Sequence, residues 1–142
     1  MTQQQMRRSL IFRAPLLLYM FSIFYLSSGP VEGAVLSQFP DYELHAAAYF
    51  VFYFLAHWAV HEGLTTAGGR GGYWLPWLLT VIYGASDEIH QSFVPSRDCS
   101  VGDFAADVAG GSLGLMGVAL LNRIAGAGLW RRRPPDPTPP SL

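Results

Sequence analysis

Apolar residues gather into four long blocks along the chain, separated by short polar or glycine-rich segments. The blocks lie at about residues 12–28, 44–61, 73–93 and 103–122. The first two are apolar over nearly their full length and are typical of membrane-spanning helices. The third and fourth contain uncharged stretches of only 13 and 15 residues, at residues 73–85 and 108–122. A helix needs about 20 residues to cross the hydrocarbon layer, so we expect both helices to continue into the acidic segments beside them.

Charge is sparse and unevenly distributed. Charged residues make up 13% of the chain, about half of the roughly 25% typical of soluble domains. All nine basic residues are Arg. If each block crosses a membrane, eight of them share one side, namely Arg7, Arg8, Arg13, Arg70, Arg123, Arg131, Arg132 and Arg133. Only Arg97 lies on the other side. The arginine-rich side of a membrane protein faces the cytoplasm. The pattern of apolar blocks and arginines therefore predicts an all-α, integral membrane four-helix bundle with both termini cytoplasmic.

The same pattern divides the chain into three parts. Residues 1–13 form a polar, basic lead-in on the cytoplasmic side, residues 14–122 form the membrane domain, and residues 123–142 form an arginine- and proline-rich tail that we expect to be disordered. A cleaved signal peptide is the competing interpretation of the first apolar block, since basic residues precede it. The net charge of −1 offers no basis for nucleic-acid binding. A single cysteine, Cys99, cannot form an internal disulfide.

The four-span topology brings polar residues from three helices to the outer face of the membrane. The candidates for ligand binding are Asp41, His45, Asp87, Glu88, Gln91, Arg97, Asp103 and Asp107. Spacings of three or four residues place several of them in pairs on one helix face, as for Asp41 and His45. Because an ionisable side chain within the bilayer costs at least about 2.5 kcal/mol, these groups should face the bundle interior and pair with one another. In one interpretation Arg97 neutralises Glu88 or Asp103. In the other, the cluster is a ligand-binding or catalytic site open to the outer leaflet.

Other polar and glycine residues have mainly structural interpretations. Gly110 and Gly114 form a GxxxG pair, which is typical of close helix packing. His57 and His61 lie four residues apart near the cytoplasmic end without a third ligand, and we expect a surface or interfacial pair. His90 should point toward lipid headgroups. The acidic residues and histidine at the outer face could hold a divalent cation, but their spacing matches no metal signature, so we predict neither a metal nor a cofactor.

The outer-face residues follow an ordered pattern along the chain. It reads Asp87-Glu88-x-x-Gln91-x-Phe93-x-Pro95-x-Arg97, followed by Asp103 and Gly110. A weaker upstream part consists of Tyr25-Leu26-Ser27-Ser28 and Asp41-x-x-x-His45. Over roughly residues 14–122, this order and spacing resemble the VanZ-like family. The chain departs from the family pattern at Tyr42, where Lys is common, and at Asp107, where Asn is common.

The resemblance implies a small multi-pass protein of the bacterial inner (cytoplasmic) membrane. Members of the VanZ-like family are linked to resistance against teicoplanin and related lipoglycopeptides. We therefore expect membrane lipid as a partner, with an envelope lipid, a lipid-linked envelope precursor or a lipoglycopeptide as the ligand, and Arg97 contacting an anionic headgroup. One alternative is an intramembrane enzyme acting on a lipid-linked substrate, with Glu88 or Asp103 as general base. Another is a structural assembly factor that packs a partner helix against the glycines of the fourth helix.

Overall fold

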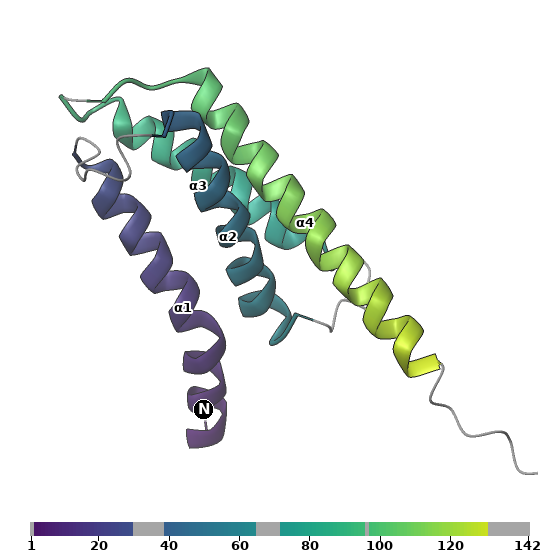
Figure 1. Cartoon of the computed structure of the whole chain (residues 1–142). Coiled ribbons are helices and arrows are strands. Elements are labelled where there is room, and N and C mark those ends of the chain that lie inside the picture. Colours follow the sequence, from purple (N-terminus) through teal and green to yellow (C-terminus); the bar gives the residue numbers. More distant parts are fainter. Residues whose placement is uncertain (1, 30–38, 65–71, 96, 131–142) are drawn as a thin grey trace, which may run out of the picture.

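Four helices make up the ordered architecture. The computed structural model describes residues 2–29, 39–64, 72–95 and 97–130, and these residues contain helices, turns and short connections but no strand. The helices are α1 (Gln3–Ser27), α2 (Asp41–His61), α3 (Trp74–Gln91) and α4 (Val101–Trp130). Successive helices run in opposite directions, so α1 begins and α4 ends at the same end of the molecule (Figure 1). The predicted all-α class with four helices is confirmed.

Helix α1 begins well before the first apolar block. The Thr2 hydroxyl accepts a hydrogen bond from the Gln5 backbone N–H at 3.3 Å, and the Gln5 side chain accepts one from the Thr2 N–H at 2.9 Å. This reciprocal pair, a capping box, satisfies two backbone N–H groups at the start of the helix. The lead-in expected at residues 1–13 is therefore helical from Gln3 onward.

Helices α3 and α4 both extend into acidic segments, as the length argument predicted. Helix α3 ends at Gln91 and so includes Asp87 and Glu88. Helix α4 begins before Asp103 and Asp107 and includes both. At its other end, α4 continues past residue 122 to residue 130, so the first part of the expected tail is helical. The remaining tail, residues 131–142, lies outside the described residues.

Arginines pair with acidic residues at both ends of α2. Arg8 contacts Glu62, the residue that follows α2, at 2.8 Å. Arg97 contacts Asp41, the first residue of α2, also at 2.8 Å. These two arginines therefore lie at opposite ends of α2. Arg70, which we expect on the same side of the membrane as Arg8, lies outside the described residues.

Helix α2 packs most closely against α4. Its Tyr53 is completely buried beside Gly114 of α4, whereas Phe52, also buried, packs on Tyr19 of α1 and Tyr83 of α3. The glycines of α4 bring the two backbones together, because a Cβ atom on Gly110 would overlap the carbonyl oxygen of Ala46, and one on Gly114 would lie 2.8 Å from the Tyr53 Cβ. The predicted GxxxG packing is confirmed. Gly110 and Gly114 therefore pack on α2 of the same chain, and a role in assembly with a partner helix stays a prediction.

Two tyrosine hydroxyls connect α1 to the other helices. Tyr19 donates a hydrogen bond to the Ala48 carbonyl at 3.0 Å, and Tyr83 donates one to the Met20 carbonyl at 2.6 Å. Much of the remaining surface of α1 is exposed and apolar, as at Phe21.

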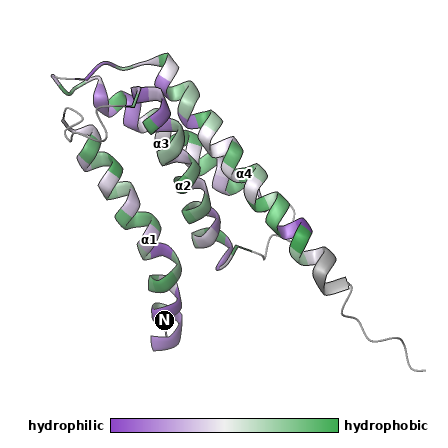
Figure 2. Ribbon diagram, viewed as in Figure 1, coloured by the Kyte–Doolittle hydropathy of each residue, from purple (hydrophilic) through white to green (hydrophobic). Residues whose placement is uncertain are grey.

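Hydrophobic residues make up much of each helix (Figure 2), and many of them are exposed. Large exposed hydrophobic residues occur on all four helices, for example Leu17, Val51, Ile82 and Met116. Extensive exposed apolar surface marks a site of contact with lipid or protein. By length and composition, α1 and residues 101–126 of α4 are able to cross a membrane.

Candidate functional site

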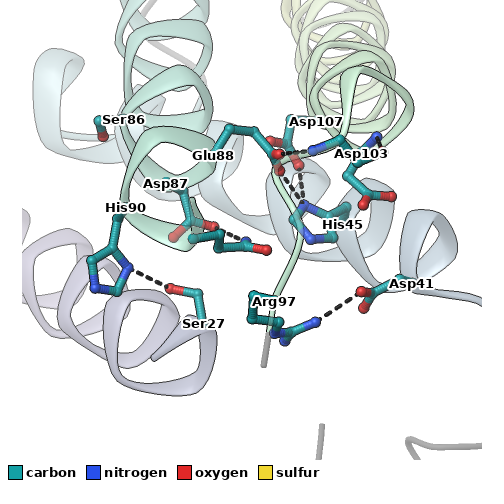
Figure 3. Close-up of polar contacts among 12 residues, drawn as sticks. Ser27, Asp41, His45, Ser86, Asp87, Glu88, His90, Arg97, Asp103 and Asp107 are labelled. Atoms are coloured by element: carbon teal, nitrogen blue, oxygen red, sulfur yellow. Dashed lines mark hydrogen bonds and ion pairs between the residues drawn. The ribbon is translucent and has the colours of Figure 1, made fainter. Parts of the chain in front are cut away.

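A cluster of polar side chains lies where α2 begins, α3 ends and α4 begins (Figure 3). At its centre, His45 Nδ1 lies 2.8 Å from Asp107 Oδ1 and 3.8 Å from Glu88 Oε1. All three side chains are buried, with exposed fractions of 8% for His45, 4% for Glu88 and 1% for Asp107. We call these three residues the central triad. Each comes from a different helix, so only the folded chain brings them together.

The surroundings of the central triad allow the three helices to approach one another. A Cβ atom on Gly84 of α3 would lie only 2.9 Å from Asp107 Oδ2, so glycine at this position lets α4 place its carboxylate against α3. Glu88 Oε2 accepts a hydrogen bond from the Ser100 backbone N–H at 2.8 Å. The Ser100 hydroxyl in turn accepts one from the Asp103 N–H at 3.2 Å. Glu88 therefore anchors the beginning of α4 as well as facing His45.

Asp87 and Gln91 form a second buried pair on α3. They lie one helical turn apart, and Gln91 Nε2 donates a hydrogen bond to Asp87 Oδ2 at 3.2 Å. Their exposed fractions are 5% and 1%. Gln91 therefore orients the Asp87 carboxylate inside the bundle.

Several buried oxygens of this region have no hydrogen-bond partner among the described residues. They are Asp87 Oδ1, Glu88 Oε1, Asp107 Oδ2 and the Tyr49 hydroxyl. An unsatisfied buried polar atom costs about 1–3 kcal/mol, and a charged one costs more. Two of these buried carboxylates, Glu88 and Asp107, face the one imidazole of His45, while Asp87 pairs with Gln91. Buried polar groups in native proteins usually have a partner, so these oxygens call for a water molecule, an ion or a ligand beside them.

Arg97 makes its contacts outside the central triad. Its Nη1 donates to Asp41 Oδ2 at 2.8 Å, and its Nε donates to the Gly29 carbonyl at 3.0 Å. The interpretation that Arg97 neutralises Glu88 or Asp103 is therefore wrong. Arg97 instead joins the chain after α1 to the start of α2, and His45 occupies the position beside the carboxylates.

The described residues offer two sets of possible metal ligands that share His45. One ligand atom each from His45, Glu88 and Asp107 lie within 4.8 Å of one another, and the same holds for Asp41, His45 and Asp103. The first set is buried, whereas the second includes the exposed Asp41 and the partly exposed Asp103. The eight residues named from the sequence thus lie in or next to one region, and their binding role stays a prediction.

The other histidines lie in surroundings that the sequence did not predict. His57 is completely buried, and within the described residues neither of its ring nitrogens has a hydrogen-bond partner. Its ring centroid lies 4.5 Å from that of His61 and 5.9 Å from that of Tyr73. The expectation of a surface or interfacial pair is therefore wrong for His57. His90 lies away from the central triad, and its ring packs on Phe24 of α1 with centroids 4.2 Å apart. Its contact with lipid headgroups stays a prediction.

Three residues near the central triad were missed from the sequence. Tyr49 lies four residues after His45, and the two rings stack at 6.5 Å, so the spacing that paired Asp41 with His45 also indicates Tyr49. Ser100 immediately precedes α4, a position where serine commonly caps a helix. No local pattern reveals Gly84, because its role depends on the carboxylate opposite it.

Comparison with known proteins connects this arrangement to a family. A family model described as VanZ/LLP1 matches residues 10–122 of the chain. The matched range includes all of α2 and α3 and every residue of the central triad. No curated protein and no solved structure matches the chain.

Proposed function

This chain belongs to the VanZ/LLP1 family, and we propose that it is a multi-pass membrane protein that engages an envelope lipid or lipid-linked amphiphile through the region around His45. The observation that carries the proposal is the burial of Asp87, Glu88 and Asp107 beside His45, at one end of a bundle with an apolar exterior. Ionisable groups at membrane depth are costly and are retained mainly where they serve a function.

We infer that all four helices cross the membrane. At 1.5 Å per residue, the 21 residues of α2 and the 18 residues of α3 extend about 31 and 27 Å, close to the ~30 Å thickness of the hydrocarbon layer. In this topology eight of the nine arginines share a side, and Arg97 lies opposite. Both termini would then face the cytoplasm, and the central triad would face the outer leaflet of a bacterial inner membrane.

The ligand would approach from the side of Arg97 and Asp103, the less buried part of the region. Arg97 donates to Asp41 and Gly29 from Nη1 and Nε, which leaves Nη2 to bind an anionic headgroup oxygen. Asp103 is partly exposed and can accept hydrogen bonds from hydroxyl or amide groups of the ligand. Gln91 is too deeply buried for direct contact and would act by orienting its neighbour on α3.

The proposal is tested with the full-length protein in nanodiscs of phosphatidylcholine, with and without a polyprenyl phosphate lipid. The measurement is the polyprenyl phosphate that remains bound after purification, quantified by mass spectrometry. We expect retention by the wild type and at least about a tenfold loss for Arg97→Ala, which removes the group that would bind the headgroup, and for Glu88→Gln, which weakens the hydrogen bond from the Ser100 N–H that positions the start of α4 beside Asp103. Glu43→Gln is the matched control, because Glu43 is exposed in the first turn of α2.

Equal retention by all folded variants would contradict the proposal. Chemical turnover of the lipid by the wild type, abolished by Glu88→Gln, would replace it with the enzymatic alternative. The same variants can be expressed in bacteria and tested for sensitivity to teicoplanin. There, Arg97→Ala and Glu88→Gln should behave like cells without the protein, and Glu43→Gln like the wild type.

A further inference from the structure

We propose that the central triad, His45, Glu88 and Asp107, binds a first-row divalent transition-metal ion, Zn²⁺ or Mn²⁺. The three side chains provide one imidazole nitrogen and two carboxylate oxygens within 4.8 Å of one another. Of the two such sets in the part of the chain that the structure describes, this is the one in which every member is buried. The set joins α2, α3 and α4, so an ion here would link three helices.

The distances suit ligands of a single ion. Zinc lies about 2.0–2.2 Å from nitrogen and oxygen ligands, so two ligands of a tetrahedral site are ~3.4 Å apart. His45 Nδ1 lies 2.8 Å from Asp107 Oδ1 and 3.8 Å from Glu88 Oε1, on either side of that value. The 2.8 Å contact is a hydrogen bond, which the ion would replace.

Unsatisfied oxygens give an independent indication of a ligand. Glu88 Oε1, on the side of His45, and Asp107 Oδ2, on the side of Gly84, are buried and have no hydrogen-bond partner among the described residues. Figure 3 shows both carboxylates directed toward His45. A hydrogen bond between His45 and Asp107 alone leaves Glu88 Oε1 unsatisfied, whereas a cation between the three side chains would give it a partner.

Charge balance also favours a divalent cation. Asp87, Glu88 and Asp107 carry three negative charges when ionised, and His45 is the only basic group among the buried residues of this region. Arg97 is engaged with Asp41 instead. A divalent ion held by a neutral His45 would reduce the excess from three negative charges to one.

The donor set indicates the class of ion. Ca²⁺ prefers about six to eight oxygen ligands, and Mg²⁺ keeps several waters in an octahedral site. Imidazole combined with carboxylates suits first-row transition metals better. Three protein ligands would leave a coordination position open for an oxygen of an anionic headgroup. The metal site nevertheless does not depend on the proposed lipid binding, because it can be measured without the lipid.

The experiment uses full-length protein without a polyhistidine tag, purified in detergent, treated with a chelator and then dialysed. Zn²⁺, Mn²⁺ or Mg²⁺ is added, unbound metal is removed, and bound metal per chain is measured by inductively coupled plasma mass spectrometry. We expect about one Zn²⁺ or Mn²⁺ per chain, weaker retention of Mg²⁺, and a higher unfolding temperature with the bound metal. Co²⁺ should give visible absorption bands of a four- or five-coordinate site, which tests the wild type without any substitution.

Matched substitutions locate the ion. Glu88→Gln and Asp107→Asn should each weaken metal binding at least about tenfold, since even the loss of a group that only hydrogen-bonds to a metal ligand costs about 10–100-fold. Glu43→Gln and Asp98→Asn remove exposed carboxylates and should bind as the wild type does. Absence of bound metal and of Co²⁺ bands in the folded wild type would overturn the proposal. So would binding that survives both triad substitutions, including binding that only His57→Phe removes.

Discussion

His45 and His57 are both buried on α2, 12 residues apart, but their surroundings differ. At the acidic end of α2, His45 lies between the carboxylates of the central triad. At the aromatic end, the His57 ring lies near those of Tyr53, His61 and Tyr73. Burial alone therefore does not distinguish a histidine of the candidate site from one that only fills space in the core. The neighbours do, because carboxylates can share a ligand or a proton with an imidazole, whereas rings mainly fill space around it.

The spacing between α2 and α4 also differs between the two ends. Near the acidic end, a Cβ on Gly110 would overlap the backbone of Ala46. Toward the aromatic end, a Cβ on Gly117 would meet the Phe54 ring at 3.2 Å. A ring can turn aside, but a helix backbone in close contact cannot. The acidic end is therefore held in a fixed arrangement, as a site built from three helices requires.

Replacing each histidine by phenylalanine should separate the two ends most clearly. With chelator present, His45→Phe leaves buried carboxylates without their partner and should lower the free energy of unfolding by about 3–5 kcal/mol. His57→Phe removes two unsatisfied nitrogens and should be neutral or stabilising, by about 1 kcal/mol or less. Denaturant unfolding in detergent, followed by circular dichroism, measures both. Equal losses for the two variants would refute the contrast.

Glycine substitutions along α4 test the difference in helix spacing. Gly110→Ala should cost about 3 kcal/mol, the upper part of the usual range for overpacking, because the new methyl group meets backbone. Gly117→Ala should cost less, since the Phe54 ring can move. Gly126→Ala, with nothing within 4 Å of the new Cβ, should instead gain about 0.5–1 kcal/mol from helix propensity. The same unfolding assay applies, and a loss at Gly126 as large as that at Gly110 would contradict this account.

The two arginine ion pairs at the ends of α2 should differ by a smaller amount in their contribution to the free energy of unfolding. The Arg97 side chain is 11% exposed and pairs with Asp41, whereas Arg8 and Glu62 are 63% and 42% exposed. Arg97→Gln should therefore cost about 1–2 kcal/mol, and Arg8→Gln less than about 1 kcal/mol. Repeating the unfolding measurement at high salt should reduce the effect of Arg8→Gln further. A larger effect for Arg8 than for Arg97 would show that exposure does not rank these pairs.

The positions of the helices and of the acidic region could be predicted from the sequence, because the thickness of a membrane sets a minimum length for each helix. The uncharged parts of the third and fourth blocks were too short to span alone, and this predicted that Asp87, Glu88, Asp103 and Asp107 would be helical. The early start of α1 could also have been predicted, since Thr2 and Gln5 have the spacing of a capping box. The prediction instead followed hydropathy, which is high only in the later residues of the helix.

The contacts of Arg97 and Gly84 could not be predicted in the same way. Arg97 lies in the connection between α3 and α4, where no helical period sets the direction of the side chain. Gly84 is needed only because Asp107 approaches it from another helix. Both contacts depend on how the helices are placed relative to one another, which local spacing does not contain.

Helix α4 has 30 residues and α2 has 21, so α4 is about 14 Å longer at 1.5 Å per residue. Its last turns extend beyond the ends of α2 and α3 (Figure 1). A fluorescent or enzymatic reporter joined directly after α4 would therefore be attached at the end of the bundle away from the His45 region. An N-terminal fusion would instead adjoin the Thr2 cap of α1. The C-terminus is accordingly the better place to attach a reporter of membrane sidedness.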